Sequence, residues 1–380
     1  MKSPQDQKAK KGKNAISSLP VLNPHAASVD LAATEHWVCV PCADGAATDV
    51  HRFGSTTRQL REIVELMRSR GVTSVVMEST GVYWIPLYEM LEMAGMEVVL
   101  TNARLLKSVP GRNQKSDRID CQWMQKLHAC GLVRGSFRPG VEITAIRTLV
   151  RESTNLVEER KRIVARMQKM LDQMNVQVHR AVTDITGTTG MAILRAIVAG
   201  VRDPLALAAM RDYRCRKSVG QIAEHLEGTW KEEHLFNLKE LLESFDHLEA
   251  KILRYEAHIQ QGLEALAPVE RATLPVPVPV KPKSNKATLK EEWLRGALWR
   301  MSGVDLTAID GIGVELARTI LTEVGPRLDA FPTVKTFVSW LHLCPRTSIS
   351  GGKPVVGKRN GYGSNRIGGR AAHGSPLALA

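Results

Sequence analysis

Two carboxylates lie three residues apart in the stretch Gln114–Trp123, which reads Gln-Lys-Ser-Asp-Arg-Ile-Asp-Cys-Gln-Trp. If this stretch opens a helix, Asp117 and Asp120 project from one face of its first turn. Ser116 or Asp117 would cap that helix, and the helix dipole favours negative charge at its start. Adjacent carboxylates repel each other unless a divalent cation lies between them, and oxygen ligands favour Mg²⁺ or Mn²⁺. The simpler interpretation is a capped, solvated helix start.

Two further acids occur upstream, where strands are predicted. Asp30 lies inside an apolar strand, where a lone carboxylate is costly unless it is paired or bound to metal. Glu78 directly follows a short buried strand over 73–77. Each acid alone is equally well explained as a strand-end or turn residue. Together with Asp117 and Asp120 they would form a two-metal site, which holds the attacking and leaving oxygens in phosphodiester chemistry.

The elements that must position these acids alternate between strands and helices. Apolar spacing predicts a hairpin over 27–40, a helix over 58–70, a strand over 73–77, a helix over 85–94 and a strand over 97–100. Such alternation favours an α/β sheet that binds its ligands at the carboxyl ends of the strands.

The pattern changes after residue 145, where apolar residues recur every seven positions. One series is Leu149, Leu156, Ile163 and Met170, and a second is Leu238, Phe245, Ile252, Ile259 and Leu266. Both are typical of coiled coils. The two helices could pair as an antiparallel hairpin within one chain or between chains as a dimer interface, and the heptads do not decide between these arrangements.

The last part of the chain follows a proline-rich spacer that begins at Leu274, where alternating prolines favour an extended linker. Beyond it, 306–317 is predicted as two helices joined by the turn Gly311-Ile-Gly313, whose second helix could hold a phosphate at its N-terminus. Ser348 and Ser350 then lie in a glycine-rich basic loop. A hydroxyl there could attack phosphorus if nearby cations stabilise the developing charge.

The overall charge points to a polyanionic partner. The 380 residues contain 52 Lys and Arg against 39 Asp and Glu, a formal net charge of +13, which favours nucleic acid over a membrane surface. Candidate phosphate contacts fall before the paired acids and around the C-terminal serines. They are Arg104, Lys107, Arg112, Lys115 and Arg118, and then Arg346, Lys353, Lys358 and Arg359.

Other classes are disfavoured. No apolar run is long enough to span a bilayer, and the basic N-terminus lacks the apolar core of a signal peptide. The pair Cys39-Val-Pro-Cys42 has no second pair at zinc spacing, so we expect reduced thiols and a cytoplasmic, nucleoid-associated bacterial protein.

Six motifs in this order resemble one family across nearly the whole chain, the DEDD transposases of bacterial insertion sequences of the IS110 type, also described as bridge-RNA-guided recombinases. The motifs are Val29-Asp30, Glu78-Ser-Thr-Gly-Val-Tyr-Trp84, Asn102-Ala-Arg104, Lys115-Ser-Asp-Arg-Ile-Asp120, Gly311-Ile-Gly313 and Ser350-Gly-Gly-Lys353. The second and fourth, at this separation, are the most specific. After Asn360 the sequence departs from the family pattern, which usually continues into a helical segment.

The resemblance implies an RNase H-like (RuvC-like) α/β N-terminal domain, a helical coiled-coil region and a mostly α C-terminal domain with a helix-hairpin-helix-like element. The expected boundaries are a basic flexible arm over 1–24, the catalytic domain over 25–145, the coiled-coil domain over 146–273, the linker over 274–295 and the transposase domain over 296–380.

The resemblance also assigns roles. It implies Asp30, Glu78, Asp117 and Asp120 as Mg²⁺ or Mn²⁺ ligands, and a serine nucleophile that forms a phosphoserine link to DNA. By position before Gly-Gly that serine is Ser350, with Ser348 as the alternative. The implied partners are double-stranded DNA, a structured guide RNA and further copies of the chain in a dimer or tetramer. Two alternatives stay open: a RuvC-like structure-selective nuclease, and a decayed transposase that only binds nucleic acid.

Overall fold

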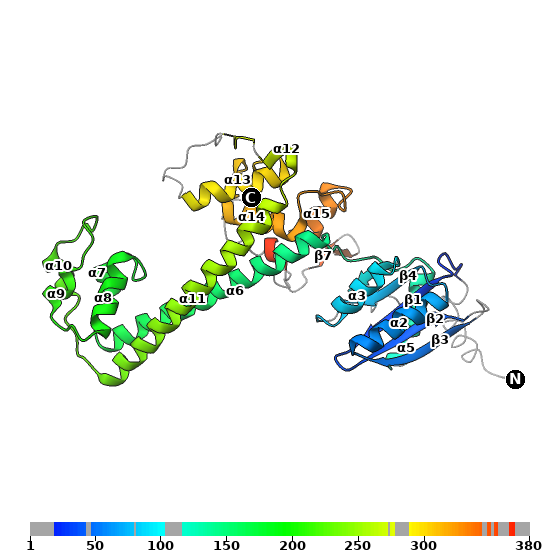
Figure 1. Cartoon of the computed structure of the whole chain (residues 1–380), viewed down its shortest axis with the longest axis horizontal. Helices are drawn as coiled ribbons and strands as arrows, with labels where there is room; N and C mark the ends of the chain where they lie inside the picture. The colour runs from blue at the N-terminus through cyan, green and yellow to red at the C-terminus, as the bar shows by residue number, and fades with distance from the viewer. Residues whose placement is uncertain are drawn as a thin grey trace. The chain divides into compact units, whose positions relative to one another are not determined.

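The chain folds into two compact units, Met1–Arg138 and Pro139–Ala380, and each is described by itself. The structure is a computed structural model that describes residues 19–42, 47–79, 81–102, 116–272, 274–277, 289–343, 348–350, 353–355 and 365–368 (Figure 1).

The first unit is an α/β fold, as predicted. Its elements in chain order are β1 (Ala26–Leu31), β2 (Glu35–Pro41), β3 (Thr48–Gly54), α2 (Thr57–Ser69), β4 (Ser74–Glu78), α3 (Trp84–Met93), β5 (Glu97–Thr101) and α5 (Asp117–Ala129). The strands form one mixed sheet in the order β3-β2-β1-β4-β5. β1, β2 and β3 pair antiparallel, whereas β4 pairs parallel to both β1 and β5. This arrangement fits an RNase H-like fold.

The strand β3 was not predicted from the sequence. It reads Thr-Asp-Val-His-Arg-Phe-Gly and none of its side chains is fully buried. As the edge strand of the sheet it packs little apolar surface, so its sequence lacks the alternation that marks half-buried strands.

The two faces of the sheet have different chemistry. On one face, alternate apolar side chains such as Val29, Val75 and Met77 form a core with the apolar stripes of α2 and α3. The opposite face carries small and polar side chains, among them Ser28 and Ser74, and α5 covers it. This second face holds the candidate site.

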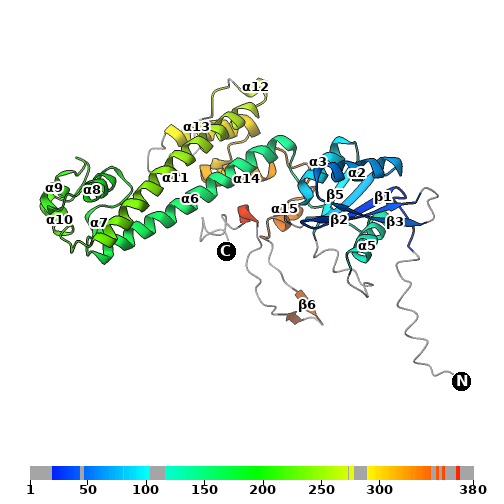
Figure 2. The same ribbon diagram turned by 60° about the horizontal axis from the view of Figure 1, so that its bottom comes forward.

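The second unit is built on two long helices, α6 (Val141–Gln173) and α11 (Glu232–Ala265). Both views show them side by side (Figures 1 and 2). Ser153 bonds to Glu256, and Arg160 forms an ion pair with Glu249, so the helices run antiparallel. Apolar residues of the predicted heptads are buried between them, with Leu156 packed against Leu248 and Ile252. The two apolar series therefore pack on each other within one chain.

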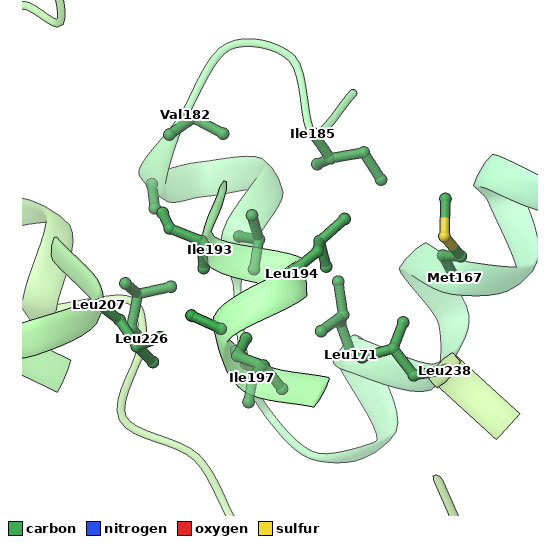
Figure 3. Packing of buried hydrophobic residues seen from close by; sticks show 14 of the residues in the cluster. Met167, Leu171, Val182, Ile185, Ile193, Leu194, Ile197, Leu207, Leu226 and Leu238 are labelled. Carbon is green, nitrogen blue, oxygen red and sulfur yellow. The ribbon is translucent and has the colours of Figure 1, made fainter. Parts of the chain in front are cut away.

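A small helical lobe, here called the tip lobe (residues 174–231), packs on the adjoining ends of α6 and α11. Its helices are α7 (Val178–Ala181), α8 (Thr188–Val198), α9 (Pro204–Ala209) and α10 (Val219–Glu224). Ile193, Leu194 and Ile197 of α8 are fully buried against Leu171 and Leu238 (Figure 3). The lobe therefore has a core of its own, continuous with the long helices.

The opposite ends of the long helices carry a second cluster of short helices. They are α12 (Val269–Ala272), α13 (Leu289–Ser302), η1 (Leu306–Ala308), α14 (Val314–Val324) and α15 (Val334–Trp340). α13 begins inside the range 274–295 that was predicted to be a linker, because Leu294 and its apolar neighbours are buried against α6, α11 and α14.

The predicted helix-turn-helix over 306–317 also differs from the structure. Its first part is only the single 3-10 turn η1, capped by the Asp305 side chain, and the second part is the start of α14. Gly311, between them, has φ +84°, a conformation that favours glycine. The Gly311–Gly313 segment therefore connects the 3-10 turn η1 to α14, and it does not join two α-helices.

The predicted serine loop is partly a β-ribbon. β6 (Ser348–Ser350) pairs antiparallel with β7 (Lys353–Val355), and Ser350 is the register partner of Lys353.

No helix in the described part of the chain has the length and apolarity needed to cross a bilayer.

Candidate active site

Helix α5 is held on the sheet by hydrogen bonds to β1. The Gln125 side chain donates to the Ala26 carbonyl at 3.0 Å, and the Ser28 hydroxyl donates to the Cys121 carbonyl at 2.7 Å. As the residue numbers rise along β1 they fall along α5, so the two elements run antiparallel. The first turn of α5 therefore lies at the end of β1 that carries Asp30.

A third contact fixes the same helix to β4. The buried Ser74 hydroxyl and His128 Nε2 are 2.8 Å apart in a hydrogen bond. Burial lowers the pKa of His128 below its ordinary value, so the ring is neutral at physiological pH. The far end of α5 is thus held to β4 by a neutral, polar contact.

The carboxyl ends of three neighbouring strands place polar residues side by side. Val29 is in register with Met77, which puts the next residues, Asp30 and Glu78, in adjacent positions on β1 and β4. Glu78 is in turn in register with Thr101 on β5. Because register partners share a face of the sheet, Asp30, Glu78 and Thr101 form a row on the face that α5 covers.

The first turn of α5 supplies two more acids. Ser116 is its N-cap, and its hydroxyl accepts a hydrogen bond from the Ile119 amide. Of the two caps that the sequence left open, the structure therefore has Ser116. Asp117 is exposed and Asp120 is half-buried, so this end of the row opens to solvent.

The electrostatics show that the four acids are neighbours. The pKa of Asp30 is raised from 3.8 to about 6, first by burial and then by the negative charges of Asp117, Glu78 and Asp120. Residues separated by as many as 90 positions in the sequence therefore act on one carboxyl group.

The donor set fits a hard divalent cation in its chemistry, because all four acids offer carboxylate oxygens, the ligands that Mg²⁺ and Mn²⁺ prefer. The Thr101 hydroxyl, fully buried beside Glu78, finds no hydrogen-bond partner among the residues that the structure describes. As the described side chains stand, however, no three His, Cys, Asp or Glu residues are grouped closely enough to hold one ion. Coordination by three of them therefore requires rotation of side chains into the site.

Thr101 is the site residue that sequence reasoning missed. Its strand was predicted, but a threonine at the end of an apolar strand carries no distinctive signal. The alignment of β5 with Glu78 is what brings it into the row.

The candidate phosphate contacts are described only in part. Arg118, on the first turn of α5, is exposed beside the acids. Four basic residues before it and three near the serines lie outside the described residues. They are Arg104, Lys107, Arg112, Lys115, Arg346, Lys358 and Arg359.

The glycine turn and the serine ribbon belong to the second unit. Gly313 is the N-cap of α14, and an added Cβ there would meet no atom within 4 Å. The described surroundings of Gly313 therefore leave room for a side chain at this position. Glu315 lies in the first turn of the same helix and pairs with Arg318 at 2.6 Å, so an acid competes with phosphate at this helix end.

Two buried thiols of the first unit, Cys39 and Cys121, are poor candidates for chemistry. Burial raises the pKa of Cys39 to about 11 and that of Cys121 to about 12. Both are free, and a thiol that stays protonated is a poor nucleophile and metal ligand.

Comparison with known families gives two matches. Residues 27–176 match the model of the IS110 DEDD transposases, described as Transposase, and residues 305–367 match the model described as Transposase IS116/IS110/IS902 family. No curated protein matches the chain. The first match contains the row of acids with α5, and the second contains the glycine turn and the β6–β7 ribbon.

Proposed function

We propose that this chain is a transposase that breaks and rejoins DNA with divalent metal ions and a serine nucleophile, guided by a structured RNA. The two matches to models of IS110-type transposases support the proposal. The observation that carries the proposal is the placement of Asp30 and Glu78 on adjacent strand ends, with the first turn of α5, which carries Asp117 and Asp120, at the same end of β1. The raised pKa of Asp30 agrees with this placement. Such a concentration of negative charge is costly for a protein that has no cation to bind there.

In this proposal Asp30, Glu78, Asp117 and Asp120 hold the metal ions. Bound divalent ions would polarise the scissile phosphate and stabilise the charge on the attacking and leaving oxygens. The chain's own contribution is positional: the hydrogen bonds from Ser28 and Gln125 fix α5, and α5 fixes Asp117 and Asp120 above the strand ends. Arg118 would contact DNA phosphates beside them.

Ser350 is the proposed nucleophile. Its hydroxyl oxygen would bond to phosphorus, the bond from phosphorus to the leaving DNA oxygen would break, and that oxygen would take up a proton. Attack by the hydroxyl of another DNA end would then release the serine and complete strand exchange. Support comes from the position of Ser350 in the second family match and from its register with Lys353, a cation suited to the developing charge.

The partners follow from the same proposal. Double-stranded DNA is the substrate, a structured RNA selects the donor and target sites, and at least two copies of the chain assemble around them. The net charge of +13 supports binding of both nucleic acids.

A strand-exchange assay tests the function. The full chain, the element ends with their flanking DNA, the transcript of the adjacent non-coding region and Mg²⁺ are combined, and recombinant junctions are sequenced. Joined products that require the transcript support the proposal. Cleavage without joining would instead identify a structure-selective nuclease, and binding without cleavage would identify a decayed transposase.

A further inference from the structure

The tip lobe lies between the two family matches apart from its first three residues, since the first match ends at residue 176 and the second begins at residue 305. It is nevertheless a well-packed body, with Leu207 and Leu226 among its fully buried residues (Figure 3). A surface built on this core is therefore held firmly, and nothing in the proposed chemistry uses it.

One loop of the lobe, here called the tip loop (residues 211–218), is braced from within. The Arg211 guanidinium donates to the carbonyl oxygens of Cys215 and Lys217 at 3.1 and 3.0 Å. The Asp212 amide donates to the Thr189 hydroxyl of α8 at 2.9 Å. The bonds from Arg211 hold the loop closed on itself, the bond from Asp212 ties its start to α8, and the Lys217 ammonium ties its end to α7 by donating to the Arg180 carbonyl oxygen. The side chain at its apex is therefore presented at little further cost in entropy.

The apex presents an uncovered aromatic ring. Tyr213 is 88% exposed, as exposed as any large apolar side chain in the described part of the chain. The Arg214 guanidinium lies 5.6 Å from the centre of that ring and is bonded to Asp212 at 2.8 Å, which holds it in place. Tyrosine and arginine are the side chains that most often carry binding energy at interfaces.

The charge around the ring is strongly positive. The tip loop has four cations, Arg211, Arg214, Arg216 and Lys217, against the single acid Asp212. Arg216 is exposed and can reach anions in solution, whereas the Lys217 ammonium donates to the Arg180 carbonyl oxygen. A flat ring among cations complements a partner with flat apolar faces and regular negative charge, which is a description of an unpaired nucleotide in a polynucleotide chain.

We propose that the tip loop binds single-stranded nucleic acid, with Tyr213 stacking on an unpaired base and Arg216 contacting a flanking phosphate. Duplex DNA would bind it poorly, because stacked and paired bases offer no free face to the ring. The tip loop lies outside the proposed active site. A variant of the loop can therefore lose single-strand binding and keep DNA cleavage, and an active-site variant can lose cleavage and keep single-strand binding.

The test uses the full chain and short single-stranded oligonucleotides that carry the fluorescent base 2-aminopurine. Stacking on Tyr213 should quench that fluorescence. Tyr213→Ala should abolish the quench and weaken binding about tenfold, whereas Tyr213→Phe should keep both, since stacking needs the ring and not the hydroxyl. Arg216→Gln should lower the slope of log affinity against log salt by about one. RNA and DNA strands are compared to identify which nucleic acid the loop prefers. A duplex of the same sequence serves as the negative control.

Phe236→Ala supplies a matched control, because Phe236 is an exposed aromatic next to the same lobe with acids such as Glu233 and Glu240 near it in sequence. It should leave affinity and quench unchanged. Equal affinity and quench in wild type and Tyr213→Ala would overturn the proposal. So would an unchanged affinity together with loss of self-association of Tyr213→Ala in sedimentation velocity, which would assign the loop to a protein contact.

Discussion

Ser28 on β1 donates a 2.7 Å hydrogen bond to the carbonyl oxygen of Cys121 on α5, joining residues 93 positions apart. Both residues are fully buried, so the bond is sheltered from water. Two residues beyond Ser28 lies Asp30, and just before Cys121 lies Asp120. The bond therefore sets the spacing between the strand acid and the helix acids, and the proposed chemistry depends on that spacing.

Asp117→Asn should reduce metal-dependent DNA strand breakage by more than about a hundredfold, because a neutral amide is a weak ligand for a hard cation. DNA affinity, measured by fluorescence anisotropy without metal, should change little. Glu65→Gln is the matched control, since Glu65 is an exposed acid on α2, across the sheet from the site. Cleavage at the wild-type rate in Asp117→Asn would remove these acids from the mechanism.

Ser350→Ala should eliminate the covalent protein–DNA adduct that survives denaturation, because alanine has no oxygen to bond to phosphorus. Adducts are detected on denaturing gels with end-labelled DNA. Ser348→Ala is the paired variant and should retain the adduct. The reverse result would move the nucleophile to Ser348, and adducts in both single variants and in the double variant would exclude this ribbon.

The stability of the metal-free chain should depend on Asp30. Its pKa is 3.8 ordinarily and about 6 in the folded chain, so the folded state binds this proton more tightly than the unfolded state. The contribution of Asp30 to the free energy of unfolding is fully present below pH 3.8 and is lost as the pH rises through about 6.

Asp30→Asn removes that loss, so with a chelator present the variant should melt at a higher temperature than wild type above pH 6. The two should converge below pH 4, where the wild-type carboxyl is protonated in both states. Asp329→Asn changes an exposed acid and is the control. Melting curves that differ by the same amount at every pH would contradict this account.

Glu256 links α11 to three neighbouring helices of the second unit, α6, α13 and α14. It accepts bonds from Ser153 at 2.7 Å and from Arg318 at 3.0 and 3.1 Å, and Lys290 lies 3.3 Å away. Burial acts to raise its pKa, but Arg318, Ser153 and Lys290 together lower it below the ordinary value. The carboxylate is therefore charged and paired at neutral pH.

Glu256→Gln should destabilise the second unit by about 2 kcal/mol, because among the described residues the buried Arg318 then keeps only the exposed Glu315 as its counter-charge. Urea unfolding followed by circular dichroism measures the loss. Glu158→Gln breaks an exposed pair with Lys161 and should cost less than about 1 kcal/mol. Similar small losses in both variants would show that the Glu256 network contributes no more than a surface ion pair.

The sequence by itself determined the elements with strong periodic signals. The buried strands, the stripe of α2 and the heptads of α6 and α11 are local patterns, so spacing alone reveals them. The cap and acids of α5 were also readable, because a capped helix start is a signal of a few adjacent residues.

Only the tertiary structure decided what those elements bring together. The edge strand β3, the pairing of α6 with α11 in one chain and the helix α13 inside an expected linker all follow from packing between distant segments. The same holds for Thr101, which joins the row of acids because β5 pairs with β4, and for the braced loop that presents Tyr213. Register and packing are set by the whole fold, so a single stretch of sequence does not contain them.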